Sequence, residues 1–170
     1  MDIELDPPNG ITGFPLGMPA QDVKTAAAGL GAVEVSDEGS ADPIDHMRVF
    51  AEHPQVSVHF LLEDGKTLTA VELWAPEEGP EPVEVRFRDI DVFGTRALEV
   101  VERLRAVGLS VVHDGEGYWA VPGLSLGFTR PPADDVPLDV DGEPLYFQSV
   151  LVGPADYYDS LLDDESVGDA

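Results

Sequence analysis

The pentapeptide Gly123-Leu-Ser125-Leu-Gly127 matches the G-x-S-x-G motif of serine nucleophiles. In that motif the serine follows a strand and opens a helix, and its histidine comes later in the chain. Here Pro131 and Pro132 follow closely and the last histidine is His113. The sequence therefore predicts that Ser125 is a strand residue between glycines and not a nucleophile.

Metal-ligating residue types occur, but without the spacing of a known site. The histidines show no pairing of the H-E-x-x-H kind, so we expect ordinary exposed residues at His46, His53, His59 and His113. The run Asp139–Glu143 looks like part of a calcium loop, yet an EF-hand register would use Pro137 and Gln148 as ligands. No glycine-rich phosphate loop occurs either. We expect no metal, no cofactor and no enzymatic activity.

The net charge of the chain limits the classes of molecule that it can bind. It has 170 residues with 34 acidic and 9 basic side chains, a formal net charge of −25, and is 43% hydrophobic. That length and apolar content indicate a folded protein of one domain or two small ones. Such a charge repels phosphate backbones and anionic membranes, so we expect no direct binding to nucleic acid and no membrane association. A basic protein is the favoured partner, unless the acidity only keeps the chain in solution; the oligomeric state stays open.

Cysteine usage and the N-terminus suggest a compartment. The chain has no cysteine, which excludes disulfides, a thiolate nucleophile and cysteine-ligated zinc. Its first residues, Met1–Asp6, are acidic where a signal peptide needs a basic and then an apolar stretch. We therefore expect a cytoplasmic protein.

The elements that would position any site are arranged as an internal repeat. A shift of 77 residues places Gly17 on Gly94 and the segment around Leu30-Gly31 on Val107-Gly108. The same shift superposes two turn signals, Asp64-Gly65 and Asp141-Gly142. We interpret residues 11–80 and 88–155 as two copies of one α+β unit, with 77–82 as linker and 156–170 as an acidic tail, for which we predict a short helix around 157–162.

Each copy begins with a helix and continues with antiparallel strands. The second copy has Thr95 as N-cap and Gly108 as a left-handed stop, with Glu99 and Arg103 paired on the solvent side. Its inward residues are predicted to be Ala97, Leu98, Val101 and Leu104. Period-two alternation predicts strands at 56–62, 67–74, 83–88, 118–121, 124–129 and 145–152. The fold class is α+β, with two tandem helix-plus-antiparallel-sheet units that form one continuous sheet or two.

The helix-opening segment Leu16-Gly17-Met18-Pro19-x-x-Asp22-Val23, followed by Leu30-Gly31 and a meander of strands, resembles the BamE/SmpA-like unit. Two such units in tandem are similar in architecture to the β-lactamase inhibitory protein. The resemblance covers roughly residues 11–155 and implies helices on one side of an antiparallel sheet whose other face holds a protein. It does not imply lactamase inhibition, because that inhibitor is secreted and disulfide-bonded and this chain has neither feature.

These observations favour a non-enzymatic, acidic protein-binding module, such as an intracellular inhibitor or an immunity-type protein. A DNA mimic, whose carboxylates imitate phosphates, is one alternative, and a small-ligand-binding domain is another. Residues that face outward from the predicted strands and loops are the candidate partner-binding residues: His59, Trp74, Arg86, Arg88, Trp119, Asp134, Asp135 and Tyr146.

Overall fold

A computed structural model describes residues 2–37, 47–76, 82–115, 117–133, 136–158 and 168–169 of the chain. Within these residues the protein contains two β-sheets and two α-helices, α1 (Ala20–Ala27) and α2 (Ala97–Ala106). The predicted α+β class is therefore confirmed, with strands dominating over helices.

The larger sheet has nine strands in the order β14-β10-β11-β12-β13-β7-β6-β5-β4, and each strand is antiparallel to its neighbours. Its two halves meet where β7 (Ala70–Trp74) pairs with β13 (Ser149–Val152). The remaining strands are β4 (Ala32–Asp37), β5 (Met47–His53), β6 (Val56–Leu62), β10 (Val112–His113), β11 (Tyr118–Val121), β12 (Leu126–Thr129) and β14 (Gly168–Asp169). A single 3-10 turn (Pro122–Leu124) joins β11 to β12.

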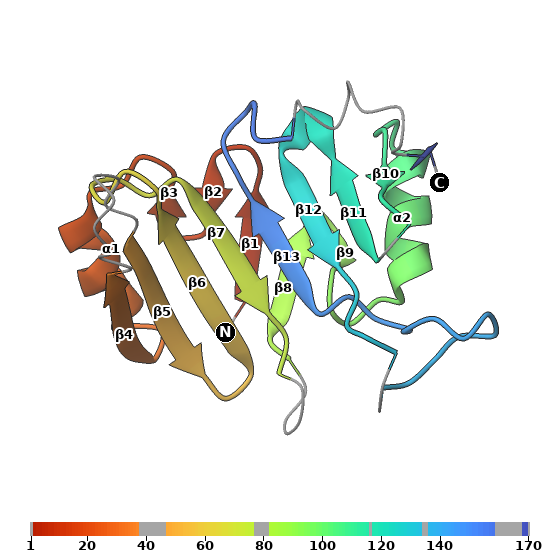
Figure 1. The fold of residues 1–170 in the computed structure, drawn as a ribbon, viewed down its shortest axis with the longest axis horizontal. Helices are drawn as coiled ribbons and strands as arrows, with labels where there is room; N and C mark the ends of the chain where they lie inside the picture. Colours follow the sequence, from red (N-terminus) through yellow and green to blue (C-terminus); the bar gives the residue numbers. More distant parts are fainter. Residues whose placement is uncertain are drawn as a thin grey trace.

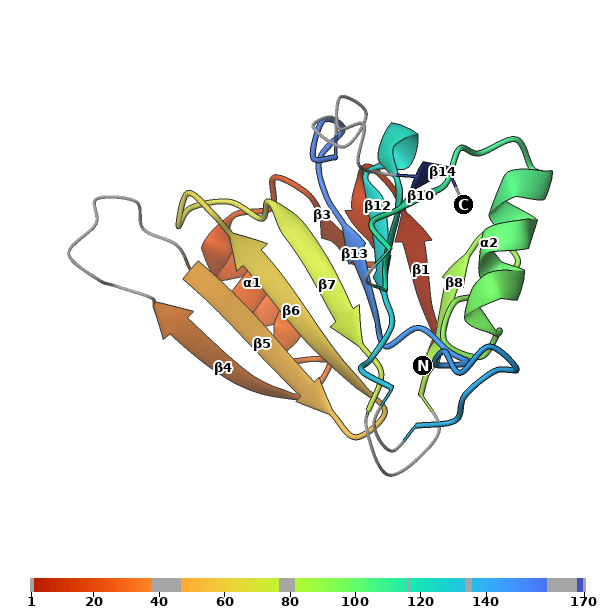
Figure 2. The ribbon, with the colours of Figure 1, turned by 45° about the vertical axis from the view of Figure 1, so that its right-hand side comes forward.

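The smaller sheet has five strands in the order β3-β2-β1-β8-β9. Its strands are β1 (Asp2–Asp6), β2 (Gly10–Ile11), β3 (Phe14–Pro15), β8 (Glu84–Phe87) and β9 (Ile90–Asp91). At its centre β1 runs parallel to β8. Figures 1 and 2 show this sheet behind the larger one, with α1 beside it at one end and α2 at the other.

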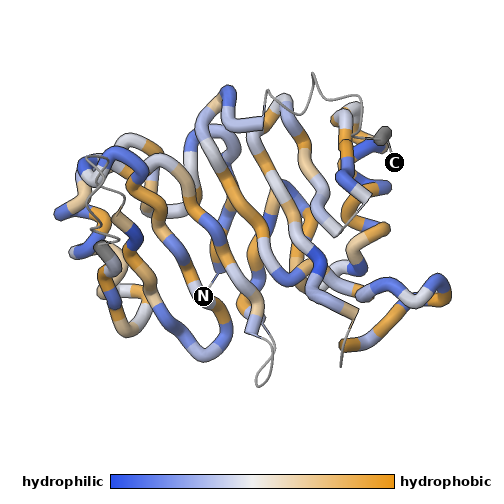
Figure 3. The backbone as a smooth tube through the Cα atoms, viewed as in Figure 1, coloured by the Kyte–Doolittle hydropathy of each residue, from blue (hydrophilic) through white to orange (hydrophobic). Residues whose placement is uncertain are grey.

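The hydrophobic core lies between the nine-stranded sheet and the layer of helices and small sheet. Alternate residues of β6 (Val56, Val58, Phe60 and Leu62) are buried there, as the period-two pattern predicts. Figure 3 shows hydrophobic and hydrophilic residues alternating along these strands. The inward face of α2 is rotated from the predicted one, because Val100 is buried and Leu98 is 43% exposed.

The other face of the nine-stranded sheet, which we name the open face, carries half-buried side chains. It is formed by Phe50, Ser57, His59, Leu61, Glu72, Trp74 and Leu151. No helix of the described residues lies over this face (Figures 1 and 2). The open face therefore presents both polar and apolar side chains that are available for contacts.

The C-terminal segment covers the part of the open face that lies at β12 and β13. The Tyr157 ring lies against Gly153, and the Tyr158 hydroxyl lies over Gly127 beside the Tyr118 hydroxyl, with which it forms a hydrogen bond. A Cβ at Gly127 would collide with both tyrosine hydroxyls. Any side chain at position 127 would therefore have to displace the tyrosines.

We expect Gly127→Ala to lower the free energy of unfolding by about 1–3 kcal/mol, because the added methyl must displace both tyrosines from a closely packed site. Gly123→Ala is the matched control, since a Cβ there meets no atom within 4 Å. Denaturant unfolding of the three proteins measures the difference. Equal stability of the two variants would contradict the tight contact.

Candidate functional site on the open face

Strand register brings an aromatic, a histidine and a carboxylate side by side at the centre of the open face. Phe50 pairs with His59, and His59 pairs with Glu72, across β5, β6 and β7. The His59 ring lies 4.8 Å from the Phe50 ring in an edge-on arrangement and 5.9 Å from the Trp74 ring. We name Phe50, His59, Glu72 and Trp74 the central patch.

A serine hydroxyl links the central patch to an exposed acid. Ser57 Oγ donates to Glu52 Oε1 at 2.8 Å and lies 3.0 Å from His59 Nε2. Because a hydroxyl has one proton and a carboxylate only accepts, His59 Nε2 must carry the proton of the second bond. A catalytic dyad needs the opposite arrangement, in which histidine accepts the serine proton. The contact therefore orients His59 and does not activate Ser57.

Burial lowers the pKa of His59 below its ordinary value of 6.5. The negative charge of Glu52 opposes this shift, whereas the positive charge of Arg48 adds to it. At neutral pH the imidazole is therefore neutral, which agrees with a single proton on Nε2. The central patch gains a positive charge only when the pH falls below the ordinary value of 6.5.

Glu72 is a half-buried carboxyl without a strong cationic partner. Burial raises its pKa above the ordinary value of 4.5, and the Trp74 and Ser149 side chains and the charge of Arg48 compensate only in part. The buried indole Nε1–H of Trp74 lowers the pKa of Glu72, although it makes no hydrogen bond of standard geometry. Glu72 thus offers a poorly solvated negative charge beside an aromatic ring.

Tyrosines border the central patch on the side of the C-terminal segment. Burial raises the pKa of Tyr118 to about 12 and also raises the pKa values of Tyr157 and Tyr158. Their hydroxyls therefore stay protonated at physiological pH. Glu72 contributes an electrostatic interaction to all three, which places it at the junction between the tyrosines and the central patch.

Two of the predicted site residues, His59 and Trp74, lie together in this patch, and the others lie elsewhere. Trp119 is buried at 8% exposure and stacks on His113 at 4.4 Å, because its position in β11 faces the core; its placement on the surface was wrong. Tyr146 is 39% exposed on the segment before β13. Asp134 and Asp135 lie outside the described residues.

Arg86 and Arg88 belong to the smaller sheet and not to the open face. Arg86 lies on β8 and forms an ion pair with Glu84 at 2.8 Å. Arg88 follows β8 with a positive φ of 56° and its guanidinium lies 5.0 Å from the centre of the Phe87 ring. Neither arginine shares a surface with His59 and Trp74.

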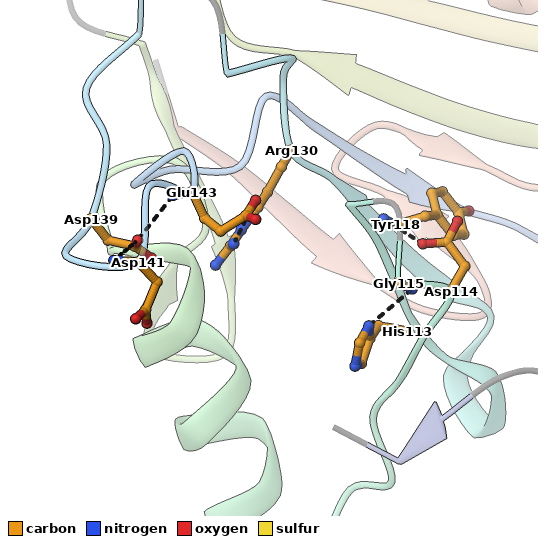
Figure 4. A network of polar contacts seen from close by, with 8 residues as sticks. All are labelled: His113, Asp114, Gly115, Tyr118, Arg130, Asp139, Asp141 and Glu143. Atoms are coloured by element: carbon orange, nitrogen blue, oxygen red, sulfur yellow. Dashed lines mark hydrogen bonds and ion pairs between the residues drawn. The ribbon is translucent and has the colours of Figure 1, made fainter.

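The acidic loop after β12 is organised by its own backbone. Asp139 Oδ1 accepts from the amides of Asp141 and Glu143, and Arg130 lies 3.9 Å from the Glu143 carboxylate (Figure 4). In the same view Asp114 accepts from the Tyr118 amide and His113 from the Gly115 amide. These contacts form turns, and among the described residues no group of three or more acidic or histidine side chains is placed to hold a metal ion.

Ser125 is fully buried, and its hydroxyl has no hydrogen-bond partner. It lies in the left-handed region (φ 52°) at the end of the 3-10 turn and precedes β12. The prediction that Ser125 is a strand residue was therefore wrong. A nucleophile must reach its substrate, and this hydroxyl does not reach the surface.

In the described part of the chain, neither helix has the length and apolar character needed to cross a membrane.

Sequence reasoning missed Phe50 and Glu72, which complete the central patch. Phe50 belongs to β5, a strand that was not predicted, and Glu72 lies in the predicted strand 67–74 but was not named as a site residue. The sequence signal that could have identified Glu72 is strand alternation: Glu72 and Trp74 lie two residues apart in one strand and must share a face. The neighbouring strand, and therefore the histidine beside them, comes only from the register.

We expect the pKa of His59 to lie below 6.5 and to fall further in Glu52→Gln, because this change removes the negative charge that favours the imidazolium. Arg48→Gln should raise it by removing a repulsive positive charge. Titration of the His59 ring resonances by NMR measures both shifts. An upward shift in Glu52→Gln would disprove this electrostatic account.

We expect Glu72→Gln to be more stable than the wild type at neutral pH. A raised pKa means that the folded state binds the carboxyl proton more tightly than the unfolded state, so the carboxylate costs stability as pH rises above about 4.5. The gain should disappear as the solution is acidified below that value. Glu102→Gln removes an equal charge at an exposed position of α2 and is the control. Urea unfolding at several pH values measures the difference, and a pH-independent gain would argue against the shift.

Comparisons with protein-family models, curated proteins and solved structures found no match to this chain. The resemblance to BamE-like units therefore stays a prediction. What can be inferred about function comes from the central patch and its surroundings, which are described directly by the structure.

Proposed function

We propose that the chain is a non-enzymatic protein-binding module, of the inhibitor or immunity type, that binds a basic protein on its open face. The observation that carries this proposal is the central patch, where the poorly solvated carboxylate of Glu72 lies beside aromatic rings. A lysine or arginine side chain from a partner would pair with Glu72 and stack on Trp74 or Phe50. Neither contact requires a rearrangement of the sheet.

Energetics support a cationic partner over an apolar one. Glu72 already bears much of the desolvation cost that an ion pair requires, so an incoming cation gains attraction with little further loss on this side. The net charge of −25 adds long-range attraction that speeds encounter with a basic protein. Interfaces also concentrate their binding energy in tryptophan, tyrosine and arginine, which fits Trp74 at the centre.

We further propose that the protein consists of two tandem repeats of one α+β unit. Strand order supports it, since β4-β5-β6-β7 is followed across the β7–β13 pair by β13-β12-β11-β10. The two helices begin at Ala20 and Ala97, which preserves the shift of 77 residues. In this arrangement the central patch lies in the first repeat, while the C-terminal tyrosines cover the corresponding part of the second.

We also propose that the chain is not an enzyme, because of the surroundings of two serine hydroxyls. Ser57 gives its proton to Glu52, and Ser125 is enclosed, so neither hydroxyl is prepared for nucleophilic attack. The module would act by occupying the surface of its partner in a stoichiometric complex.

Affinity capture from lysate of the native host tests this function. We expect a basic protein to bind in a 1:1 complex that weakens steeply as salt rises. Purified partner should lose at least about tenfold in affinity with Trp74→Ala and with Glu72→Gln. Because Glu72→Gln is expected to stabilise the fold, its loss of binding could not be attributed to unfolding.

Leu98→Ala and Glu102→Gln are the matched controls, since both residues are exposed on α2 and away from the open face. Binding that these variants weaken as much as the patch variants would place the interface elsewhere. A captured DNA-binding protein that duplex DNA displaces would instead favour the DNA mimic. No complex at any salt concentration would overturn the module and return attention to small ligands.

A further inference from the structure

A second candidate interaction surface lies at the edge of the nine-stranded sheet formed by β4. One edge of this sheet ends in β14, which pairs with β10. At the opposite edge, no strand of the described residues pairs with the outer side of β4. The strand has six residues and pairs with β5 at each of them, from Ala32 to Asp37, so no bulge interrupts it. Its outer backbone groups therefore form a regular row that no strand of the described residues pairs with.

The sequence of β4 lacks the protection that would keep a basic segment away from an exposed edge. Natural edge strands carry charged side chains, above all lysine, or proline, contain a bulge, or are very short, which prevents pairing with other chains. The residues of β4, AVEVSD, include neither lysine nor proline, and the two charged residues, Glu34 and Asp37, are acidic. Val33 and Val35 are 37% and 41% exposed, although their partners in β5, Ala51 and Val49, are fully buried. The apolar face of β4 is thus only partly covered.

We propose that the outer edge of β4 binds an extended segment of another protein in which apolar and basic side chains alternate. An added strand would supply the missing backbone hydrogen bonds and continue the sheet, in the mode called β-augmentation. Side chains on one of its faces would lie beside Val33 and Val35. Those on the other face would lie beside Glu34, which pairs with Phe50 and so shares the open-face side.

Charge selects this occupant over a second copy of the chain. Two copies would each carry a charge of −25, and antiparallel pairing of β4 with itself would place both Glu34 side chains on the same face. With a basic segment, both the long-range interaction and the contact with Glu34 become attractive. The inference concerns a surface other than the central patch and does not depend on the function proposed for it.

The test uses the full chain and two synthetic heptapeptides of equal composition, Lys-Val-Lys-Ile-Lys-Val-Lys and Lys-Lys-Lys-Lys-Val-Ile-Val, each labelled with a fluorophore. We expect the alternating peptide to bind at least about tenfold more tightly, because only its pattern fits both faces of an added strand. Hydrogen exchange should slow over residues 32–37 when it binds. Equal affinity of the peptides, or no protection at β4, would overturn the proposal.

Val35→Lys and Val107→Lys separate the edge from general charge effects. Both replace an exposed valine, at 41% and 54% exposure, and both change the net charge equally. We expect Val35→Lys to weaken the alternating peptide at least about tenfold and Val107→Lys to leave its affinity unchanged. Equal effects would mean non-specific attraction. Sedimentation of the chain alone completes the test, since a dimer that Val35→Lys dissociates would mean that a second copy occupies the edge.

Discussion

The pairing of β7 with β13 is the contact on which the rest of the structure depends. It joins the two halves of the nine-stranded sheet through four residue pairs, from Trp74 with Ser149 to Val71 with Val152. On the core side it buries Val71, Leu73, Val150 and Val152 completely. On the other side the same register places Glu72 next to Leu151. The strand that closes the core therefore also supplies the centre of the open face.

This double role explains why the centre of the sheet contains polar groups that are poorly satisfied. A residue in β7 cannot be moved outward without moving its core-facing neighbours, because successive side chains alternate between faces. Glu72 consequently bears a desolvation cost and the Trp74 Nε1 stays without a hydrogen bond. Such costs are common at binding sites, where stability is reduced in favour of recognition.

The sequence predicts the locally encoded parts of this fold well. Strands β6 and β11 have the predicted bounds, the Glu99–Arg103 ion pair forms at 2.6 Å, and Gly108 is left-handed with a φ of 89°. Each depends on residues that are close in the chain. Gly31, which the repeat aligns with Gly108, shows the limit, because it does not have the left-handed conformation of Gly108. Its actual constraint is the close approach of the Glu52 backbone, which belongs to another strand.

Long-range pairing accounts for most of what was missed. The strands β2, β3 and β9 have two residues each, too few for a periodic signal, and the parallel pairing of β1 with β8 joins distant segments. Strand β5 was missed because Phe50 breaks its polar side with a large apolar residue. That break is itself informative, since an apolar residue on the solvent side of a strand has a contact to make there.

The exposed part of the open face and the part that the tyrosines cover show two solutions to one physical problem. An antiparallel sheet with helices on one side leaves its other side to water, and large apolar side chains there favour burial. Toward β12 and β13 the chain covers the sheet itself, by laying Tyr157 and Tyr158 over glycines. At the central patch Phe50 and Trp74 stay half-exposed beside Glu72, a carboxylate that an apolar segment of this chain could not satisfy. A cation brought by another molecule would relieve both the apolar exposure and the poorly solvated charge, so this asymmetry between the two halves is what the proposed binding function rests on.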